Sequence, residues 1–277
     1  MNSQKKKTNR FFIWFLIIVI AVWWFNNYTL KAAIFEIESD KIDTPIRIVA
    51  VSDMHYEKIG ISRKAIKEKI KAQNPDIICV LGDMYSRKGI FDEASENSKK
   101  AVEFMDSLTE ISPVYFVPGE HDYEPEYLAA IEMSDVNLMS YKEEFVTVKD
   151  NKLRILGINN VNFSNTFDLE NEFVKPDGEV YNILLAHIPM PEFYEKFGAD
   201  LTLCGDTHGG IIRLPYVGAF NVNGKWFPEL KSDAEVYDKG LFGYGDGKYI
   251  GITSGLGSFP APVRFMNRPE VLVIDVI

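Results

Sequence analysis

Residues 46–55 read IRIVAVSDMH, and this stretch decides the fold class. Its first seven residues are mostly apolar and β-branched, which is typical of a short strand buried on both faces. An acid and a histidine, Asp53 and His55, follow directly at its end. In sheets of α/β proteins, ligands bind beyond the carboxyl ends of the strands, so we expect the chemistry of this protein to lie there.

The chain beyond this strand alternates between strand and helix patterns. The alternation predicts an α/β layered fold with helices on the outside. No Pro/Gly-rich linker divides the body, so we expect one domain. Residues 216–248 are rich in Gly, Asp and Tyr without a clear period, and we expect a long loop region there. The other expected strands are 77–81, 114–117, 145–148, 153–158, 183–186, 201–204, 249–253 and 271–277, and the expected helices are 62–72, 93–108 and 124–133.

The N-terminus carries an uncharged apolar run, FFIWFLIIVIAVWWF, over residues 11–25. Its 15 residues are fewer than the roughly 20 that span a bilayer unaided, but the next five residues can extend it. Trp23 and Trp24 suit the membrane interface, and the preceding basic residues favour a cytoplasmic N-terminus. A cleaved signal peptide remains the alternative, although residues 31–33 offer no clean small-x-small cleavage site.

These features predict a division of the chain. We expect a basic cytoplasmic tail at 1–10, a single-pass transmembrane anchor at 11–30, a linker and lead-in at 31–45 and a catalytic domain at 46–277. The domain would then lie outside the cytoplasm whether or not the segment is cleaved, and an uncleaved segment would hold it at the cell membrane.

Composition excludes several classes of protein. Of the 277 residues, 46% are hydrophobic and 25% are charged, which excludes wholesale disorder. Beyond the first ten residues the chain carries 26 bases and 40 acids, a net charge of −14, which argues against nucleic-acid binding through a basic surface. Only two cysteines occur, Cys79 and Cys204, so a disulfide scaffold is excluded, and we expect both to be buried thiols.

All four histidines lie in short motifs that follow expected strands. One such motif alone is most often an ordinary turn, but five in order at strand ends predict a shared site. Imidazole and carboxylate together suit a divalent ion such as Mn, Fe or Zn. The five motifs are Asp53-Met54-His55, Gly82-Asp83, Gly119-Glu120-His121-Asp122, His187-Ile188-Pro189 and Gly205-Asp206-Thr207-His208-Gly209-Gly210.

This series resembles the calcineurin-like metallophosphoesterases, whose motifs run D-x-H, G-D, G-N-H-D/E, a lone His and G-H-x-H. The resemblance spans residues 46–277. HGGIIRLP at 208–215 and SGLGSFPAPVRFMNRPEV at 254–271 are similar to a membrane-anchored bacterial subgroup, whose relatives include UDP-2,3-diacylglucosamine pyrophosphatases. The resemblance implies a four-layer α/β/β/α sandwich, preceded here by the one transmembrane helix.

The resemblance also implies a site of two divalent ions. The first ion would be held by Asp53, His55, Asp83 and His208, with Asp83 bridging to the second. The second would also take Glu120, His187 and Asp206. His121 falls at the substrate-contacting position and would protonate the leaving group, while Asp122 would either orient His121 or cap the next helix. Arg264 and Arg213 are weaker candidates for contacting substrate phosphate.

The sequence departs from the family at two ligand positions. Glu120 stands where the family has Asn, and Asp206 stands where it has the first His of G-H-x-H. A lesser departure is Ile211, where the subgroup often has Gln. Both ligand changes affect the second ion, and the added carboxylates favour Mn over Zn, with Fe, Zn or Mg also open.

The function expected from these residues is two-metal activation of water to hydrolyse a phosphodiester, pyrophosphate or phosphomonoester bond. The substrate would be a phosphate-containing small molecule or lipid, such as an envelope precursor near the membrane. The alternative is a catalytically weakened relative that binds metal or ligand through an altered second site. The sequence leaves the oligomeric state open.

Overall fold

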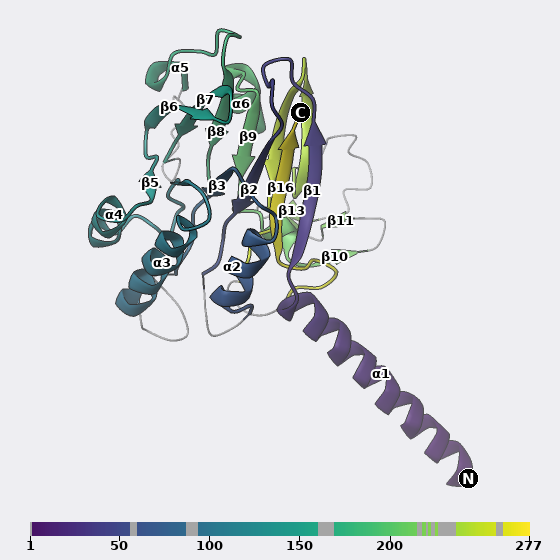
Figure 1. The fold of residues 1–277 in the computed structure, drawn as a ribbon. Helices are drawn as coiled ribbons and strands as arrows, with labels where there is room; N and C mark the ends of the chain where they lie inside the picture. The colour runs from purple at the N-terminus through teal and green to yellow at the C-terminus, as the bar shows by residue number, and fades with distance from the viewer. Residues whose placement is uncertain are drawn as a thin grey trace.

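The computed structural model describes residues 2–55, 60–86, 94–159, 169–214, 218–219, 221–222, 225–226, 237–258 and 263–277. Two six-stranded sheets pack face to face, and helices cover the outer face of each sheet (Figure 1). This is the four-layer α/β/β/α sandwich that the family resemblance implies.

The first sheet contains the strand that opens the domain. Its order is β1 (Lys31–Ile37), β16 (Glu270–Val276), β2 (Ile46–Val51), β3 (Ile77–Val80), β4 (Val114–Phe116) and β5 (Asn137–Leu138). Strands β2, β3, β4 and β5 run parallel, so the loops that follow them meet at one edge. Its outer helices are α2 (Arg63–Lys71), α3 (Ala94–Leu108) and α4 (Pro125–Glu132).

The second sheet supplies the remaining motifs. Its order is β14 (Gly240–Gly245), β15 (Lys248–Ile252), β9 (Leu201–Cys204), β8 (Tyr181–Leu185), β7 (Asn151–Gly157) and β6 (Lys142–Val148). Strands β7, β8, β9 and β15 are parallel. Its outer helices are α5 (Leu169–Glu172) and α6 (Pro191–Phe197).

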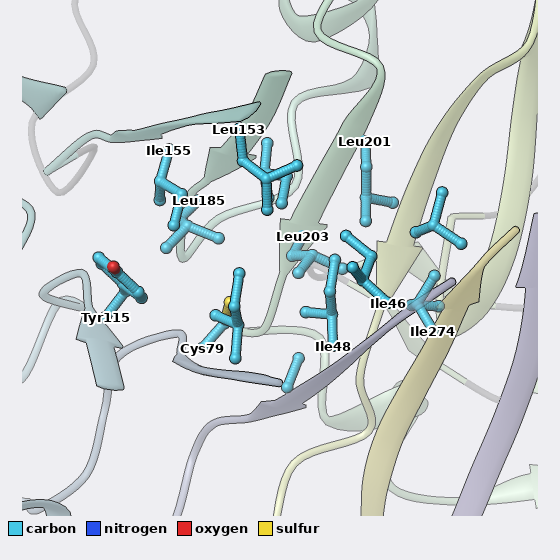
Figure 2. Close-up of a cluster of buried hydrophobic side chains, with 14 of the residues drawn as sticks. Ile46, Ile48, Cys79, Tyr115, Leu153, Ile155, Leu185, Leu201, Leu203 and Ile274 are labelled. Carbon is cyan, nitrogen blue, oxygen red and sulfur yellow. The ribbon is translucent and has the colours of Figure 1, made fainter. Parts of the chain in front are cut away.

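The core between the sheets is made by strand residues that point inward from both sides. Ile48 of β2 and Cys79 of β3 face Leu185 and Leu203 of the second sheet (Figure 2). Each fully buried aliphatic side chain contributes roughly 1.5–3 kcal/mol relative to exposure. Burial of Cys79, and of Cys204 beneath the helices of the second sheet, confirms that both are buried thiols.

Helix α2 illustrates how local sequence and packing agree. The Ser62 hydroxyl accepts a hydrogen bond from the Ala65 N–H and caps the first turn. Ile66 and Ile70, one turn apart, are buried against the first sheet. The helix therefore carries the chain from the end of β2 back toward the start of β3.

Residues 31–45, expected to be a linker, begin with a strand of the domain. Strand β1 pairs in parallel with β16, with Lys31 opposite Glu270 and Ile37 opposite Val276. The partner strand lies at the other end of the chain, so neighbouring sequence gives no sign of this pairing. Strand β1 therefore extends the first sheet into residues that precede the expected domain.

The expected loop at 216–248 also contains strands. Strand β14 is an edge strand that pairs with β15, and shorter pieces are β11 (Gly218–Ala219), β12 (Asn221–Val222) and β13 (Lys225–Trp226), while β10 (Arg213–Leu214) lies just before the expected loop. Glycines at 240, 243 and 245 conceal β14 because they lower strand propensity, although an edge strand with a bulge tolerates them. Residues 216–217, 220, 223–224 and 227–236 of this expected loop lie outside the described residues.

Helix α1 (Asn2–Tyr28) projects away from the sandwich (Figure 1). Its stretch Arg10–Tyr28 has a mean hydropathy of 1.8 and is only 11% buried. Length and composition therefore suit a membrane span, although a signal sequence would meet the same test.

Candidate metal centre

The five sequence motifs converge at the edge where the strands of both sheets end. The donor atoms form three overlapping groups, and the atoms within each group lie within 4.8 Å of one another. The groups are Asp53, His55 and His208; His55, Asp83 and His121; and Asp53, Asp83 and His187. Six of the residues expected at the site are therefore brought together by loops that follow β2, β3, β4, β8 and β9.

Asp83 lies at the centre of this cluster. Its Oδ2 is 3.4 Å from Nε2 of His187 and 3.8 Å from Nε2 of both His55 and His121. Burial alone would raise the pKa of Asp83, but His187, His55 and His121 together lower it below the usual value. Asp83 is thus held as a carboxylate facing three imidazoles, which is the arrangement expected of a bridging ligand.

The Asp53 side chain is fully buried at the end of β2. Its Oδ2 accepts hydrogen bonds from the Ser52 hydroxyl and the Asp206 N–H, which leaves Oδ1 3.6 Å from Nε2 of His208. Burial raises the pKa of Asp53 to about 7, despite the opposing effect of His187. Removing this carboxylate from water is costly unless a cation compensates it.

His55 and His208 face each other within the donor group that they form with Asp53. Their Nε2 atoms are 3.2 Å apart, and Nδ1 of His55 lies 2.8 Å from the Ser86 hydroxyl. Burial lowers the pKa of His55 to about 3 and also lowers that of His208, so both rings are neutral. Neutral imidazole is the form that binds a metal ion.

His187 is fixed by the backbone of the opposite sheet. Its Nδ1 donates to the carbonyl oxygen of Leu81, 2.6 Å away, which directs Nε2 toward Asp83. A hydrogen bond from the distal nitrogen sets both the tautomer and the orientation of a metal-binding histidine. Burial would lower the pKa of His187, but the nearby Asp83 carboxylate raises it overall.

The backbone at these motifs is held in an unusual conformation. Positive φ angles occur at Asp53, His55, Asp83, Asp206 and His208. For residues other than glycine this left-handed conformation costs roughly 1–2 kcal/mol each, although Asp and Asn tolerate it best. Clustering of such residues at one place is typical of a functional site.

Gly82 shows how closely the loops approach. A Cβ at this position would lie 2.5 Å from the backbone nitrogen of Gly119 and 2.7 Å from Nδ1 of His187. Only glycine allows this contact between the loops after β3 and β4. The Gly-Asp motif thus brings two ligand loops together.

The two residues that depart from the family lie at the edge of the cluster. The side chain of Glu120 is 54% exposed, with Oε1 3.9 Å from Nε2 of His121. The side chain of Asp206 is 21% exposed, with Oδ1 3.9 Å from Nε2 of His187. Neither belongs to the three donor groups, so the expected ligand set is only partly assembled on this side.

His121 and Asp122 have different surroundings. His121 is half-buried, and its backbone N–H donates to Asp83 Oδ1 at 2.8 Å, so its ring lies beside the donors. Asp122 is fully buried, and its Oδ2 accepts hydrogen bonds from the N–H groups of Asp83 and Gly119. Neither expected role of Asp122 matches these contacts, since helix α4 begins after Glu124 and the carboxylate joins two backbone loops instead. Burial raises its pKa to about 7.

The two candidate phosphate-binding arginines are hydrogen-bonded to nearby loops, and among the described residues Nη1 of Arg264 is buried without a hydrogen-bond partner. The Arg264 guanidinium is buried and donates to the carbonyl oxygens of Ser254 and Gly257. Arg213 pairs with Asp238 and donates to the Gly209 carbonyl oxygen. The sequence shows that these arginines are present, but it does not show that they donate hydrogen bonds to the backbone of nearby loops.

Two supporting residues escape the sequence motifs. Ser86 lies behind His55, and the Asn267 amide donates to the His208 carbonyl oxygen at 2.7 Å. Asn267 falls within the quoted run 254–271, which could have drawn attention to it. Nothing in the sequence distinguishes Ser86 from other loop serines.

The residues present fit a divalent metal. Among the described residues, Asp53 Oδ1 is buried without a hydrogen-bond donor and is aimed at imidazole nitrogens. Carboxylate oxygens and neutral imidazoles together form a donor set suited to Mn, Fe or Zn. A cation at this place would compensate the buried carboxylates.

Comparison with known proteins agrees with this geometry. Residues 46–210 match the family model described as calcineurin-like phosphoesterase. The chain belongs to this family. As a calcineurin-like phosphoesterase it is a hydrolase that acts on phosphoester bonds, and the family's use of divalent metals fits the Asp/His cluster.

Relatives of this phosphoesterase cover nearly the whole chain. Phosphodiesterase YaeI of Escherichia coli is 28% identical over 264 residues, which cover 92% of this chain and 89% of that protein. An uncharacterized metallophosphoesterase of Aquifex aeolicus is 27% identical, covering 90% and 92%. Among solved structures, TT1561 of Thermus thermophilus aligns with a TM-score of 0.48 at 12% identity, covering 77% of this chain and 91% of that one.

Proposed function

We propose that this phosphoesterase is held in the cell membrane by α1 and hydrolyses a phosphodiester or pyrophosphate bond outside the cytoplasm, with a phosphomonoester also open. Its substrate would be a lipid or envelope precursor, and it would use two divalent ions, with Mn preferred. The observation that carries the proposal is Asp83, whose carboxylate faces three imidazoles within 4 Å.

The donors can be assigned to two ions that share Asp83. The first ion would be held by Asp53, His55, Asp83 and His208, and the second by Asp83, His187, Asp206 and Glu120. When bound, such ions would polarise phosphoryl oxygens and make water a stronger nucleophile at neutral pH.

The residues beside the donors would position the reaction. His121 is half-buried at the edge of the cluster, where its ring could give a proton to the leaving oxygen. Its backbone is tied to Asp83, which keeps the ring at a fixed distance from the ligands. Asp122 would act indirectly, by holding the loops that carry Asp83 and Gly119 in place.

The proposed membrane location and the proposed substrate class are supported by different observations. The apolar α1 supports anchoring, and the basic residues before it support a cytoplasmic N-terminus. The name of the Escherichia coli relative supports a phosphodiester over a monoester.

The first experiment is to count bound ions in the full chain, purified in detergent, loaded with Mn²⁺ and freed of excess ion. We expect two ions per chain and fewer in Asp83→Asn. The same samples would be assayed on a chromogenic phosphodiester, a phosphomonoester and a pyrophosphate-containing lipid precursor. A chain that binds two ions but cleaves none of these would contradict the proposed substrate range.

Retention of fewer than two ions would instead favour the alternative of a weakened second site. The matched test is the double change Glu120→Asn with Asp206→His. A large gain in hydrolysis would indicate a weakened relative, whereas a loss from an active parent would indicate an enzyme adapted to its carboxylates.

Metal preference is tested separately by titrating Mn²⁺ and Zn²⁺ into the metal-free chain. We expect Asp206→Asn to weaken binding of the second Mn²⁺ more than that of the second Zn²⁺, because the carboxylate is the harder ligand. Tight Zn²⁺ binding at both sites that does not change in Asp206→Asn and Glu120→Asn would contradict the preference for Mn.

A further inference from the structure

An exposed apolar surface lies where α1 joins the domain. It consists of Ile212, Leu214, Val263, Phe265 and Met266, which we call the apolar shelf. Ile212 and Phe265 form a parallel bridge, so their side chains lie side by side. Phe265 is 42% exposed and Met266 is 49% exposed. Arg264, which lies between Val263 and Phe265 in the sequence, is buried.

The shelf is fixed to the end of α1. The Asn27 amide donates to the Arg264 carbonyl oxygen at 2.9 Å, and its Oδ1 accepts from the Arg264 N–H at 3.0 Å. Arg268 lies over the Phe25 ring and donates to the Thr29 hydroxyl. The last turn of the helix and the shelf therefore belong to one rigid unit.

The shelf and the metal donors lie at the same edge of the fold. In the first sheet, Lys31 at the start of β1 is opposite Glu270, and Ala50 near the end of β2 is opposite Leu272. Helix α1 thus enters the domain at the edge where β2 delivers Asp53. In Figure 1, β10, which contains Leu214, also lies toward the end of the domain from which α1 emerges.

The position of the apolar helix indicates what covers the shelf. The candidate membrane span, Arg10–Tyr28, has 19 residues and rises about 28 Å at 1.5 Å per residue, close to the roughly 30 Å of a bilayer core. Asn27, near the end of this span, is the residue that is hydrogen-bonded to the shelf, so the helix leaves the bilayer where the shelf begins. Arg268, which lies over the Phe25 ring, is placed to meet lipid phosphates at this level.

We infer that the apolar shelf lies in the membrane interface and holds the metal cluster against the leaflet in which α1 ends. The occupant of the shelf is the acyl and headgroup boundary of the bilayer. The site then takes a phosphate that is presented at the lipid surface rather than one that diffuses through bulk water. This inference rests on the membrane anchoring in the proposed function.

The test uses the full chain in phospholipid vesicles, with a polarity-sensitive fluorophore on Met266→Cys. Met133→Cys is the matched control because Met133, 88% exposed at the end of α4, belongs to a different surface. The native Cys79 and Cys204 are buried, so unmodified chain gives the labelling background. Vesicles carry a quencher on the acyl chains, and iodide quenches from the water.

We expect the probe at position 266 to emit at shorter wavelength and to lose several-fold more emission to the lipid quencher than the probe at position 133. Equal quenching by iodide at both positions, in chain that stays with the vesicles after an alkaline wash, would overturn the shelf and leave the anchor intact. Chain that washes off the vesicles would overturn the anchor and the shelf together. A shielded probe at position 266 in detergent-free chain without vesicles would instead indicate a protein partner or a second copy, and would also overturn the inference.

Discussion

The metal cluster has a buried half and an open half, and the two are built differently. In the buried half, Asp53 and His55 each have a polar partner behind them, Ser52 and Ser86, and their backbones are held at positive φ. In the open half, Glu120 is largely exposed and Asp206 stands at the edge. The comparison teaches that the fold itself positions the donors of the buried half. In the open half, Glu120 and Asp206 would have to move toward an ion in order to bind it.

The largest expected effect comes from replacing a donor of the buried half. Asp53→Asn keeps a side chain that tolerates positive φ but removes the charge. We expect Mn²⁺ affinity to fall by more than about 100-fold, the upper end of the loss seen when only a supporting partner of a ligand is removed. Calorimetric titration of the metal-free full chain measures this. A loss smaller than that for Asp206→Asn would reverse the proposed division between the halves.

The support behind His55 is expected to matter next. Ser86→Ala removes the hydroxyl that lies 2.8 Å from His55 Nδ1 and should weaken metal affinity by about 10–100-fold. Ser107→Ala is the control, because its hydroxyl donates only to the Phe104 carbonyl oxygen within α3. Equal metal affinity in the two variants would mean that Ser86 does not orient the imidazole.

Two glycines provide a matched test of how tightly the buried half is packed. Gly255 and Gly247 have φ angles of 71° and 70°, but a Cβ at Gly255 would lie 2.7 Å from Asp53 Cβ, whereas nothing lies within 4 Å at Gly247. The backbone cost is therefore common to both alanine variants, and overpacking should destabilise Gly255→Ala by about 1–3 kcal/mol more. Urea unfolding of the metal-free chain measures the difference, and identical midpoints would contradict it.

The smallest expected effect lies in the open half. Glu120→Gln removes one exposed charge, and exposed charge pairs contribute less than about 1 kcal/mol, so Mn²⁺ affinity should change by at most about fivefold. The titration used for Asp53→Asn applies here. A larger loss would show that Glu120 turns inward onto the ion, which would make the two halves more alike.

Much of the fold could be predicted from local sequence. The strand at 46–52, the helix at 62–72 and the strands near 77, 183 and 201 lie within a residue or two of their observed ends. These elements have a strong apolar pattern and clear ends, such as the Ser62 cap. Strands β1 and β14 were missed because edge pairing with a distant partner, rather than local propensity, makes them strands.

Some residues of the candidate site could be predicted from the sequence and others could not, because only some of them depend on local pattern. Histidines and aspartates directly after buried strands could be placed together, because parallel strands end at one edge. The directions of Arg264, Arg213 and Asp122 could not be read from sequence, since an arginine can face substrate or backbone carbonyls equally well. Arg264 donates to the Ser254 carbonyl oxygen ten positions before it, and Arg213 pairs with Asp238, 25 positions after it. Asp122 accepts from the N–H of Asp83, 39 positions before it. Only the folded chain brings these groups near one another.

The sequence by itself determined the strand–helix alternation, the five ligand motifs in their order and the apolar helix at the N-terminus, because each rests on neighbouring residues. Only the tertiary structure decided that Glu120 lies outward, that Arg264 is buried, and that the apolar shelf meets the end of α1 beside the metal donors. The last of these outcomes depends on pairing between segments more than 200 residues apart, since Asn27 and Arg264 differ by 237 positions. Contacts at such separation arise from packing of the whole domain rather than from any local pattern.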